Sequence, residues 1–414
     1  MKEQSNQRKN CRLCNSKRLK LCFSLVPTPP ANAFVVKQRI SEKQQTFPLD
    51  IFFCEDCYHI QLLEIVNPEN LFENYVYVSG TSPIFVKHFE EYAYYVLDNF
   101  PQPKNSLIMD IGSNDGTLLR FFKEKGHRVL GVEPAKEICR KVNSQGIETL
   151  NGFFNYDLSN EIREKYGKIN IITANNVFAH VDDLKGFVNG VKNLLTKDGI
   201  FVFEVSYVLD VIKSLLFDTI YHEHLSYHAV IPLISFFKKN NMELIEAIRV
   251  ETHGGSLRGI AKLKNGRYEV GKSVQECVNL EQNFAIDKLK TYVDFFQPIE
   301  VRKKELLELL KKLKNEKKTI AGFGAPAKAT TFMYQFGIDE KIIDFIIDDS
   351  PLKQGLFSPG MHIPVYSAEK IYEKNPDYLI ILAWNFANSI MKKHKKFKNN
   401  GGHFIVPLPK LEIY

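Results

Sequence analysis

Residues 107–122 read LIMDIGSNDGTLLRFF, which is the pattern of a buried strand, a glycine-bearing turn and a helix. Gly112 and Gly116 let the backbone of this turn pass close to a ligand, while Asp110 and Asp115 bring carboxylates to it. The next apolar run, HRVLGVE, ends in Glu133, and an acidic residue at such a strand end commonly binds the hydroxyl pair of a ribose. The stretch therefore predicts a strand-turn-helix unit that binds a ligand containing a ribose.

The turn has the form D-x-G-x-x-x-G rather than the G-x-G-x-x-G of a dinucleotide site. It is similar to the S-adenosylmethionine loop of class I methyltransferases, and that ligand is cationic and needs no pyrophosphate cradle. A later run, NIITANNVFAH (170–180), places polar side chains just past the carboxyl end of a strand, where open α/β sheets bind ligands. The alternative is an ordinary turn with surface acids. We expect the methyl donor to contact Asp110, Gly112, Asn114, Asp115, Gly116, Glu133, Pro134 and Asn175.

Apolar runs alternate with amphipathic helical patterns over most of the chain. INIITAN (169–175) and GIFVFEV (199–205) continue the first series, and TIAGFGAP (319–326) and YLIILAW (378–384) belong to a second. Unbroken apolar strands between helices are typical of a parallel sheet covered on both faces. The sequence predicts an α/β protein with a small N-terminal domain (1–69), a central Rossmann-like class I methyltransferase domain (70–265) and a second, C-terminal Rossmann-like domain (266–414).

The composition is that of a soluble globular enzyme: of 414 residues, 44% are hydrophobic and 25% charged, which excludes general disorder. No apolar run reaches the roughly 18 residues of a membrane span, and the polar start MKEQSNQRKN lacks a signal-peptide core. We therefore expect a cytoplasmic monomer with no membrane partner. The formal charge of +7 is scattered; it suits an anionic ligand but does not indicate a nucleic-acid partner.

Four of the seven cysteines form two close pairs, Cys11-x-x-Cys14 and Cys54-x-x-Cys57. Each pair places two thiolates on one tight knuckle, and two knuckles complete a tetrahedral sulfur shell for zinc. Four sulfur ligands leave no open position, so we expect a structural Zn²⁺ site. The alternatives are two unrelated reduced pairs, or a zinc-bearing nucleic-acid-binding protein; the latter would need a concentrated basic stripe, which the sequence lacks.

Residues 217–228 read FDTIYHEHLSYH and follow a predicted strand, so they lie on a loop or short helix near the same edge of the sheet. In a catalytic interpretation, one histidine is a general base and tyrosine hydroxyls bind a developing oxyanion. Two alternatives remain open: a metal site using His222 and His224, and histidines that only stabilise the loop. A helical conformation would place Tyr221 and His224 on one face, whereas an extended one would place His222 beside His224.

The run GFGAPAK (322–328) has the form G-x-G-x-x-A after a predicted strand, with Lys328 adding positive charge. Its backbone amides and the following helix N-terminus favour a phosphate, and NAD is one option among several nucleotides. The turns LRG (257–259) and LKQG (352–355) contain Arg258 and Lys353; each could hold a pyrophosphate or be an ordinary loop.

Taken in order, the paired cysteines, the D-x-G-x-x-x-G core, the Tyr-His-Glu-His segment and GFGAPAK resemble the nucleotide-sugar C-methyltransferases that make branched deoxysugars. The resemblance covers nearly the whole chain. It implies a zinc domain, an S-adenosylmethionine domain and a C-terminal domain that helps to hold a dTDP- or GDP-linked 4-keto deoxysugar, methylated at C3 through an enolate. It further implies that His224 is the base and that Tyr221, Glu223 and His180 are its partners. The expected substrate-binding residues are Tyr75, Tyr77, Ser79, Asn176, His222, Arg258, Gly324, Lys328 and Lys353.

Two other functions fit the motifs. The methyl donor could serve an O- or N-methyltransferase of another small molecule, which would need no ketone in its substrate. Alternatively, the turn that contains Gly322 and Gly324 could bind NAD in an oxidoreductase.

Overall fold

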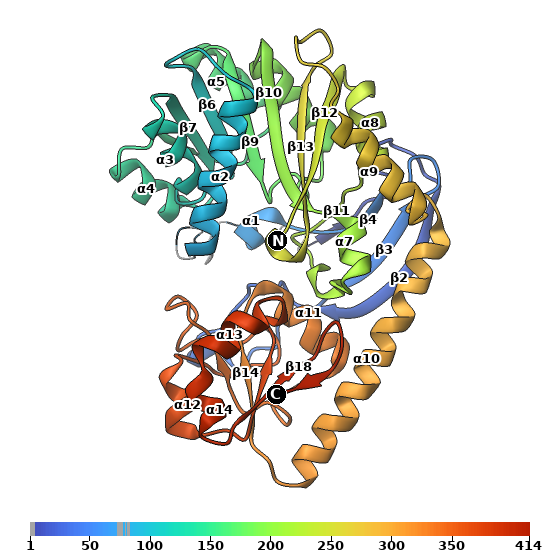
Figure 1. Ribbon diagram of the computed structural model, residues 1–414, viewed down its shortest axis with the longest axis vertical. Coiled ribbons are helices and arrows are strands. Elements are labelled where there is room, and N and C mark those ends of the chain that lie inside the picture. The colour runs from blue at the N-terminus through green and yellow to red at the C-terminus, as the bar shows by residue number, and fades with distance from the viewer. Residues whose placement is uncertain (1–4, 73–77, 79, 81–82) are drawn as a thin grey trace.

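The computed structural model describes residues 5–72, 78, 80 and 83–414 and shows three parts: an N-terminal β-rich domain, a central α/β domain and a C-terminal α/β domain (Figure 1). The central domain lies above the C-terminal domain in this view, and the long helix α10 (Leu289–Asn315) runs along one side between them. None of the described helices combines the length and the hydropathy that a bilayer crossing needs.

A seven-stranded sheet forms the centre of the central domain. Its strands are β6 (Leu107–Ile111), β7 (Arg128–Glu133), β8 (Thr149–Asn151), β9 (Ile169–Asn175), β10 (Leu195–Ser206), β12 (Met242–Val250) and β13 (Ser256–Leu263). They follow the order β12-β13-β10-β9-β6-β7-β8. All neighbours run parallel except β13, which is antiparallel to both β10 and β12. This topology, with one reversed strand near an edge, confirms the predicted class I methyltransferase fold.

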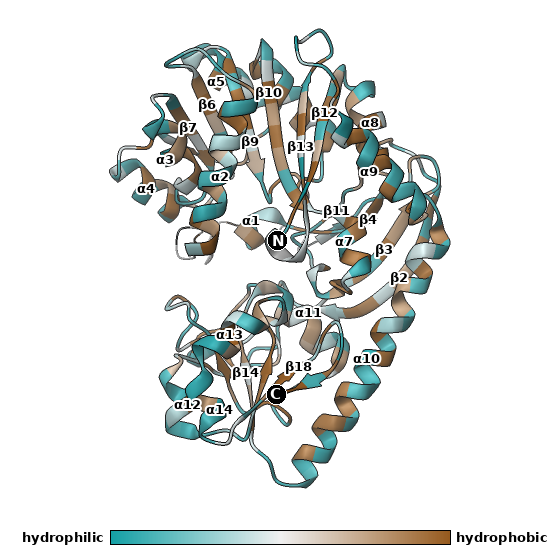
Figure 2. Ribbon diagram, in the orientation of Figure 1, coloured by the Kyte–Doolittle hydropathy of each residue, from teal (hydrophilic) through white to brown (hydrophobic). Residues whose placement is uncertain are grey.

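Helices cover both faces of this sheet, which explains why its strands are apolar throughout. On β6, Met109 and Ile111 pack into one core cluster, while Ile108 packs into another together with Tyr92. Figure 2 shows the strands of both α/β domains as mostly brown, hydrophobic ribbons and the helical surfaces as mixed with teal. The helices are α2 (Pro83–Asn99), α3 (Thr117–Glu124), α4 (Lys136–Ser144), α5 (Tyr156–Tyr166), α6 (Leu184–Leu194), α7 (Val208–Lys213) and α8 (Val230–Lys239).

The C-terminal domain is a second doubly wound sheet with a core of its own. Its strands are β14 (Ile320–Phe323), β15 (Ile346–Ile347), β16 (Val365–Tyr366), β17 (Tyr378–Ile381), β18 (His403–Val406) and β19 (Glu412–Ile413), in the order β16-β15-β14-β17-β18-β19. All neighbours are parallel except β18 and β19. The prediction of a second Rossmann-like unit is confirmed. Its helices are α11 (Ala327–Phe336), α12 (Glu369–Lys374), α13 (Ala387–Lys393) and α14 (Lys395–Asn399).

Helix α9 (Lys272–Asn283), which the predicted boundary assigns to the C-terminal domain, packs against β12 and α8 of the central domain. Its buried Glu281 accepts hydrogen bonds from Val230 N at 2.6 Å and Ile231 N at 2.9 Å, the first two residues of α8. The same carboxylate accepts a bond of 2.7 Å from the Tyr207 hydroxyl. Glu281 therefore caps a helix that has no capping side chain of its own.

The N-terminal domain contains β1 (Ser5–Gln7), β2 (Leu19–Thr28), β3 (Phe47–Cys54), β4 (Ile60–Leu62), β5 (Glu64–Val66) and α1 (Pro68–Phe72). Its four-stranded sheet has the order β11-β4-β3-β2, and β11 (Ser226–Tyr227) comes from the Tyr-His segment far along the chain. The loop after β2 reaches the C-terminal domain, where Thr330 donates a hydrogen bond of 3.0 Å to the Ala31 carbonyl. The small domain thus contacts both α/β domains.

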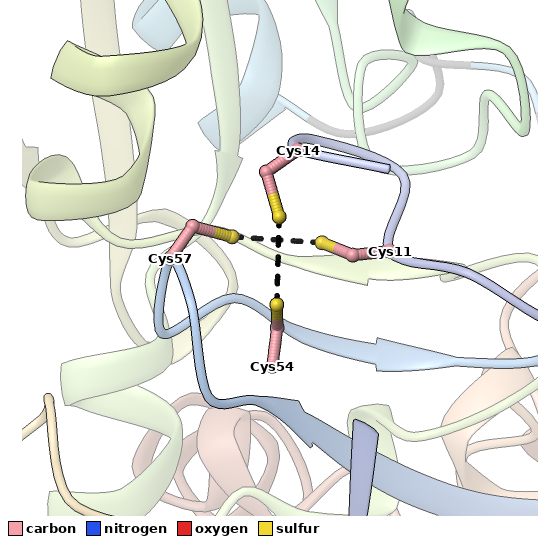
Figure 3. A group of neighbouring side chains, drawn as sticks. All are labelled: Cys11, Cys14, Cys54 and Cys57. Atoms are coloured by element: carbon pink, nitrogen blue, oxygen red, sulfur yellow. Dashed lines mark hydrogen bonds between the residues drawn. The ribbon is translucent and has the colours of Figure 1, made fainter. Parts of the chain in front are cut away.

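The four paired cysteines meet at one point of the N-terminal domain (Figure 3). Their sulfur atoms all lie within 4.8 Å of one another, and the Cys11–Cys57 and Cys14–Cys54 pairs are each 3.5 Å apart. A disulfide would need about 2.05 Å between sulfurs, whereas Zn–S bonds of about 2.3 Å in a tetrahedron give sulfur separations of about 3.8 Å. The donor set and its spacing fit a structural zinc ion, as predicted.

The cysteine knuckle also touches the central domain. Arg12, between Cys11 and Cys14, is buried, and its Nε lies 3.0 Å from Asp182 Oδ1 in the segment that follows β9. Arg8 contacts the same carboxylate oxygen at 2.9 Å. Through these two ion pairs, the zinc-binding segment contacts the loop that contains His180 and Asp182.

Replacing one zinc ligand should release the metal and loosen the N-terminal domain. We expect Cys54→Ser to lose its zinc and to melt several degrees below the wild type, because a structural zinc site contributes folding energy directly. Metal analysis of the purified protein and a thermal unfolding curve measure both effects. The control is Cys22→Ala, which removes a buried thiol that is not in the cluster and should keep one zinc per chain. A Cys54→Ser protein with full zinc content would contradict the assignment.

Removing the Glu281 carboxylate should destabilise the protein. We expect Glu281→Ala to lower the free energy of unfolding by about 3 kcal/mol, because two buried donors and one partly buried donor lose their acceptor. Glu276→Ala, an exposed glutamate on the same helix, should change it by less than about 0.5 kcal/mol. Denaturant unfolding followed by circular dichroism compares the two, and equal midpoints would contradict the capping role.

Candidate functional site

One cleft with a volume of about 610 Å³ is lined by residues of all three domains. The carboxyl ends of β6 and β9, where the chain turns to opposite faces of the central sheet, form one side of it. The carboxyl ends of β14 and β17, the equivalent point of the C-terminal sheet, face them from the other domain. Open α/β sheets bind ligands at such switch points, so the cleft can hold two ligands at once.

In the turn after β6, the backbone at Gly112 passes close to a neighbouring side chain, as the sequence predicted. Gly112 has φ +68°, and its N–H donates a hydrogen bond of 2.7 Å to the Val132 carbonyl. A Cβ at this position would lie only 2.4 Å from Val177 Cγ2. A side chain at this position would be strained and would clash, so the cleft floor needs glycine. Gly116, also at positive φ, precedes α3 and does not line the cleft.

Four carboxylates of the central domain line the cleft: Asp110, Asp115, Glu133 and Asp182, of which Asp182 is already paired with Arg8 and Arg12. Asp110 is buried and accepts a hydrogen bond of 2.6 Å from Thr173 Oγ1; burial raises its pKa to about 7. Glu133 accepts bonds of 2.8 Å from the backbone N–H groups of Asn114 and Ala135, and burial raises the pKa of this carboxyl as well. A cationic ligand would offset the cost of ionising these buried groups.

The lining continues with the residues that follow β9. Asn175 ends this strand, and Asn176 has φ +54° with its N–H bonded to the Glu204 carbonyl at 2.7 Å. His180 follows, and its ring lies 5.0 Å from that of His224. His180 lines the cleft, and its buried Nε2 makes no hydrogen bond within the described residues. Burial, and then the facing His224, lower the pKa of His180 well below its ordinary value.

His224 has a defined tautomer. Its Nδ1 lies 2.7 Å from the Thr219 carbonyl, which can only accept, so Nδ1 carries the proton and Nε2 keeps its lone pair. The Tyr221 hydroxyl lies 3.2 Å from Nε2 and is the donor of that bond. Both side chains line the cleft. The spacing of three places Tyr221 and His224 together, although the segment is a turn rather than a helix.

Thr219 of this segment also lines the cleft, whereas His222 and Glu223 do not. His222 is buried with Nε2 3.2 Å from the Phe47 carbonyl, and burial lowers its pKa to about 4. This stabilising contact differs from the substrate contact predicted for His222. Glu223 accepts a hydrogen bond of 2.7 Å from Asn32, which does line the cleft. Among the residues that the structure describes, only the four cysteines bring three or more metal-ligating atoms together, so nothing supports the His222–His224 metal interpretation.

Two buried lysines of the C-terminal domain form part of the opposite wall. Lys328 lies in the first turn of α11, and Lys353 Nζ donates a hydrogen bond of 2.8 Å to the Ala325 carbonyl. Burial lowers the pKa of both ammonium groups. Gly324, which was predicted to contact the substrate, does not line the cleft. It has φ +91°, and a Cβ at this position would lie 2.6 Å from the Cβ of Ala383.

Arg258 does not line the cleft. It lies on β13, and its Nη2 and Nε contact Glu204 Oε2 at 3.0 and 3.1 Å, with the guanidinium over the Tyr92 ring at 4.2 Å. Residues 257–259 (LRG), which were predicted to form a turn, belong instead to strand β13 of the central sheet. Tyr75, Tyr77 and Ser79 lie outside the described residues.

Sequence reasoning missed several residues that line the cleft. Asn32 comes from the Pro-rich loop after β2, which carries no motif. Asn385 and Phe386 follow β17, and the rule that ligands bind beyond the carboxyl ends of parallel strands could have found them. Phe85 and Phe89 on α2 also line the cleft, and only the fold reveals this.

Comparisons with known proteins agree with this architecture. Residues 11–72 match a family model described as "Putative zinc binding domain", residues 86–247 a "Methyltransferase domain" and residues 251–409 a "C-methyltransferase C-terminal domain". The C-methyltransferase NovU of Streptomyces niveus is 32% identical over 403 residues, which cover 97% of this chain and 96% of NovU.

Solved structures show a weaker likeness. A complex between the Haloferax volcanii Trm112 methyltransferase activator and a methyltransferase has 14% identity and a TM-score of 0.35, covering 45% of this chain and 95% of that chain. An S-adenosylmethionine-dependent methyltransferase from Clostridium acetobutylicum has 16% identity and a TM-score of 0.36, covering 44% and 92%.

The family assignment therefore rests on the near full-length match and the three domain matches, which agree with the cysteine cluster and the strand order. The chain belongs to the C-methyltransferase family and is an S-adenosylmethionine-dependent methyltransferase with a zinc-binding N-terminal domain.

Proposed function

We propose that this enzyme methylates C3 of a nucleotide-linked 4-keto deoxysugar, with dTDP or GDP as the nucleotide, through an enolate. The observation that carries the proposal is the charge arrangement of the cleft that all three domains line. Carboxylates line the wall given by the central domain, and buried lysines line the wall given by the C-terminal domain. The first wall suits a cationic methyl donor and the second an anionic diphosphate, with Tyr221 and His224 in the same cleft.

Bound S-adenosylmethionine supplies an electrophilic methyl group, and the enzyme must make a carbon nucleophilic. A C–H bond beside a carbonyl can lose its proton, because the charge moves to the carbonyl oxygen; a 4-keto sugar offers such a bond at C3. The Asp110 and Glu133 carboxylates and the turn at Gly112 would hold the donor at the switch point of the central sheet. This positioning supplies much of the rate in a transfer between two bound molecules.

His224 is the proposed base. Its neutral tautomer has the lone pair on Nε2, and that atom faces the cleft through its contact with Tyr221. An ordinary imidazole, with a pKa of about 6.5, is too weak to form a free enolate, so the developing charge on the C4 oxygen needs a hydrogen-bond donor. The Tyr221 hydroxyl can turn from Nε2 to that oxygen, which would free the lone pair for the C3 proton. His180, whose Nε2 makes no hydrogen bond to the residues that the structure describes, is a second group that lines the cleft and can contact the sugar.

The remaining residues would hold the substrate. Lys328 and Lys353 would contact the diphosphate, since an anion offsets the cost of burying their charges. Asn176 and Asn32 are the polar side chains that would contact the sugar, with Asn32 oriented by Glu223. In the transfer, the C3–methyl bond forms as the sulfur–methyl bond breaks, and the bonding pair of the latter stays on sulfur.

The reaction itself tests the proposal. The protein is incubated with a dTDP- or GDP-linked 4-keto-6-deoxy sugar and S-adenosylmethionine in deuterated water, and mass spectrometry and proton NMR follow the product. We expect a methyl group on carbon and loss of the C3 hydrogen signal. Methylation without exchange or loss at C3 would contradict the enolate route, and inactivity with every such sugar would contradict the substrate class.

Replacing the base should stop catalysis without preventing donor binding. We expect His224→Asn to lower the methylation rate by about 10²- to 10⁴-fold and to abolish C3 exchange, while the Kd for S-adenosylmethionine stays within about twofold. Turnover assays and calorimetry measure the two quantities. His403→Asn, on the exposed residue that begins β18, is the matched control and should keep full activity. Unchanged turnover in His224→Asn would remove this residue from the base role.

Donor binding should weaken at acidic pH because Asp110 must be ionised to hold a cation. Its pKa is raised to about 7 by burial, so the Kd for S-adenosylmethionine should rise as the pH falls through 7, about tenfold for each further unit. Asp110→Asn should bind weakly at every pH. Asp98→Asn, on an exposed residue of α2, should retain the wild-type profile. Calorimetry across this range measures the effect, and a flat wild-type profile would contradict it.

A further inference from the structure

A buried group of three side chains joins the central and C-terminal domains beside the cleft. Asp218 lies on the 3₁₀ turn η3 (Phe217–Thr219), Lys328 on α11, and Trp384 begins the 3₁₀ turn η5 (Trp384–Phe386) after β17. Trp384 Nε1 donates a hydrogen bond of 2.6 Å to Asp218 Oδ2. Lys328 Nζ lies 3.4 Å from the same oxygen and 4.2 Å from the centre of the Trp384 ring.

The Lys328 ammonium retains capacity to bind an anion. It has three N–H donors, yet within the described residues Nζ makes no hydrogen bond, because its contact with Asp218 lacks hydrogen-bond geometry. Lys328 lines the cleft, whereas Asp218 is fully buried behind it. The carboxylate and the indole therefore hold the ammonium at the wall of the cleft, where its N–H donors make no hydrogen bond to the described residues.

We infer that Asp218 is a positioning residue, which keeps Lys328 charged and directed into the cleft so that Lys328 can bind the diphosphate of the substrate. The inference rests on the proposed function and adds how a positive charge is kept on a largely buried side chain. Without Asp218, the ammonium would be buried with only an aromatic ring beside it. A lysine in that position would lose its proton more readily.

The surroundings of Lys328 contain few other charges. Asp218 is the charged group within ion-pair distance of its Nζ among the described residues. Helix α11 and the turn η5 contain no other charged residue, and the lysine of β2, Lys20, is exposed. Glu300 of α10 contacts the other end of α11, through Gln335. Lys353, Tyr221 and His224 share the cleft with Lys328. The pKa of Lys328, lowered by burial, is raised again by Asp218.

The chain contains a single tryptophan, so Trp384 reports on this group without a label. Its fluorescence is followed while dTDP or GDP is added to the full-length protein between about pH 6 and pH 9. We expect a saturable change in emission in the wild type, with a Kd that varies little with pH. Lys328→Met should lose the response. In Asp218→Asn, the Kd should rise about tenfold for each pH unit above the lowered pKa of Lys328, and adding Lys328→Arg should remove that pH dependence, since arginine stays charged.

The controls separate this inference from the proposed function. Asp294→Asn breaks an exposed aspartate–lysine pair on α10 and should behave as the wild type. An Asp218→Asn protein with the wild-type Kd and pH profile would overturn the positioning role, as would a wild type that shows no emission change with either diphosphate. Methylation of a 4-keto sugar nucleotide in the same preparation would leave the proposed function intact in those cases. Failure to methylate, with the expected fluorescence series, would leave the positioning role standing.

Discussion

The hydrogen bond from His224 Nδ1 to the Thr219 carbonyl decides which ring nitrogen can take a proton, and the rest of the site depends on how this carbonyl is held. Thr219 belongs to the turn η3 of the central domain, which packs against helix α11 of the C-terminal domain. Phe217 stacks on Phe336 of α11 with ring centres 5.2 Å apart, and Thr331 of the same helix donates 2.8 Å to the carbonyl next in the chain. The contact between domains and the orientation of the His224 ring are therefore one structural arrangement.

The two walls of the cleft show the same electrostatic principle with opposite signs. Burial disfavours the ionised form of Asp110 and Glu133 on one wall, and the charged form of Lys328 and Lys353 on the other. Each wall is thus least stable when empty and gains most from a ligand of the complementary charge. Groups that would be costly in a packed core are tolerated here because binding compensates for their burial.

Much of the fold and part of the site could be predicted from local patterns. Apolar runs identified the strands of both sheets, and the C-x-x-C pairs identified the cluster, because each depends on residues close in sequence. Arg258 and His222 illustrate the limit of local patterns. Arg258 was predicted on a turn but lies on a strand, because three residues are too few to tell a turn from a strand. His222 was predicted to contact the substrate but faces away from the cleft, because neighbouring residues of a loop can face opposite sides. Asn32 reaches the cleft only because β2 crosses to the other domain, which no local pattern encodes.

The strand β11 has an evolutionary consequence. Ser226 and Tyr227 pair with Gln61 and Ile60, so the N-terminal sheet is completed by a segment that begins two residues after His224. An exchange of the zinc domain between relatives would transplant a sheet without its edge strand and leave the loop that contains Tyr221 and His224 without its support. Recombination that preserves activity should therefore inherit residues 5–66 and 217–228 as a pair. Although they lie far apart in the chain, the two segments form one heritable unit.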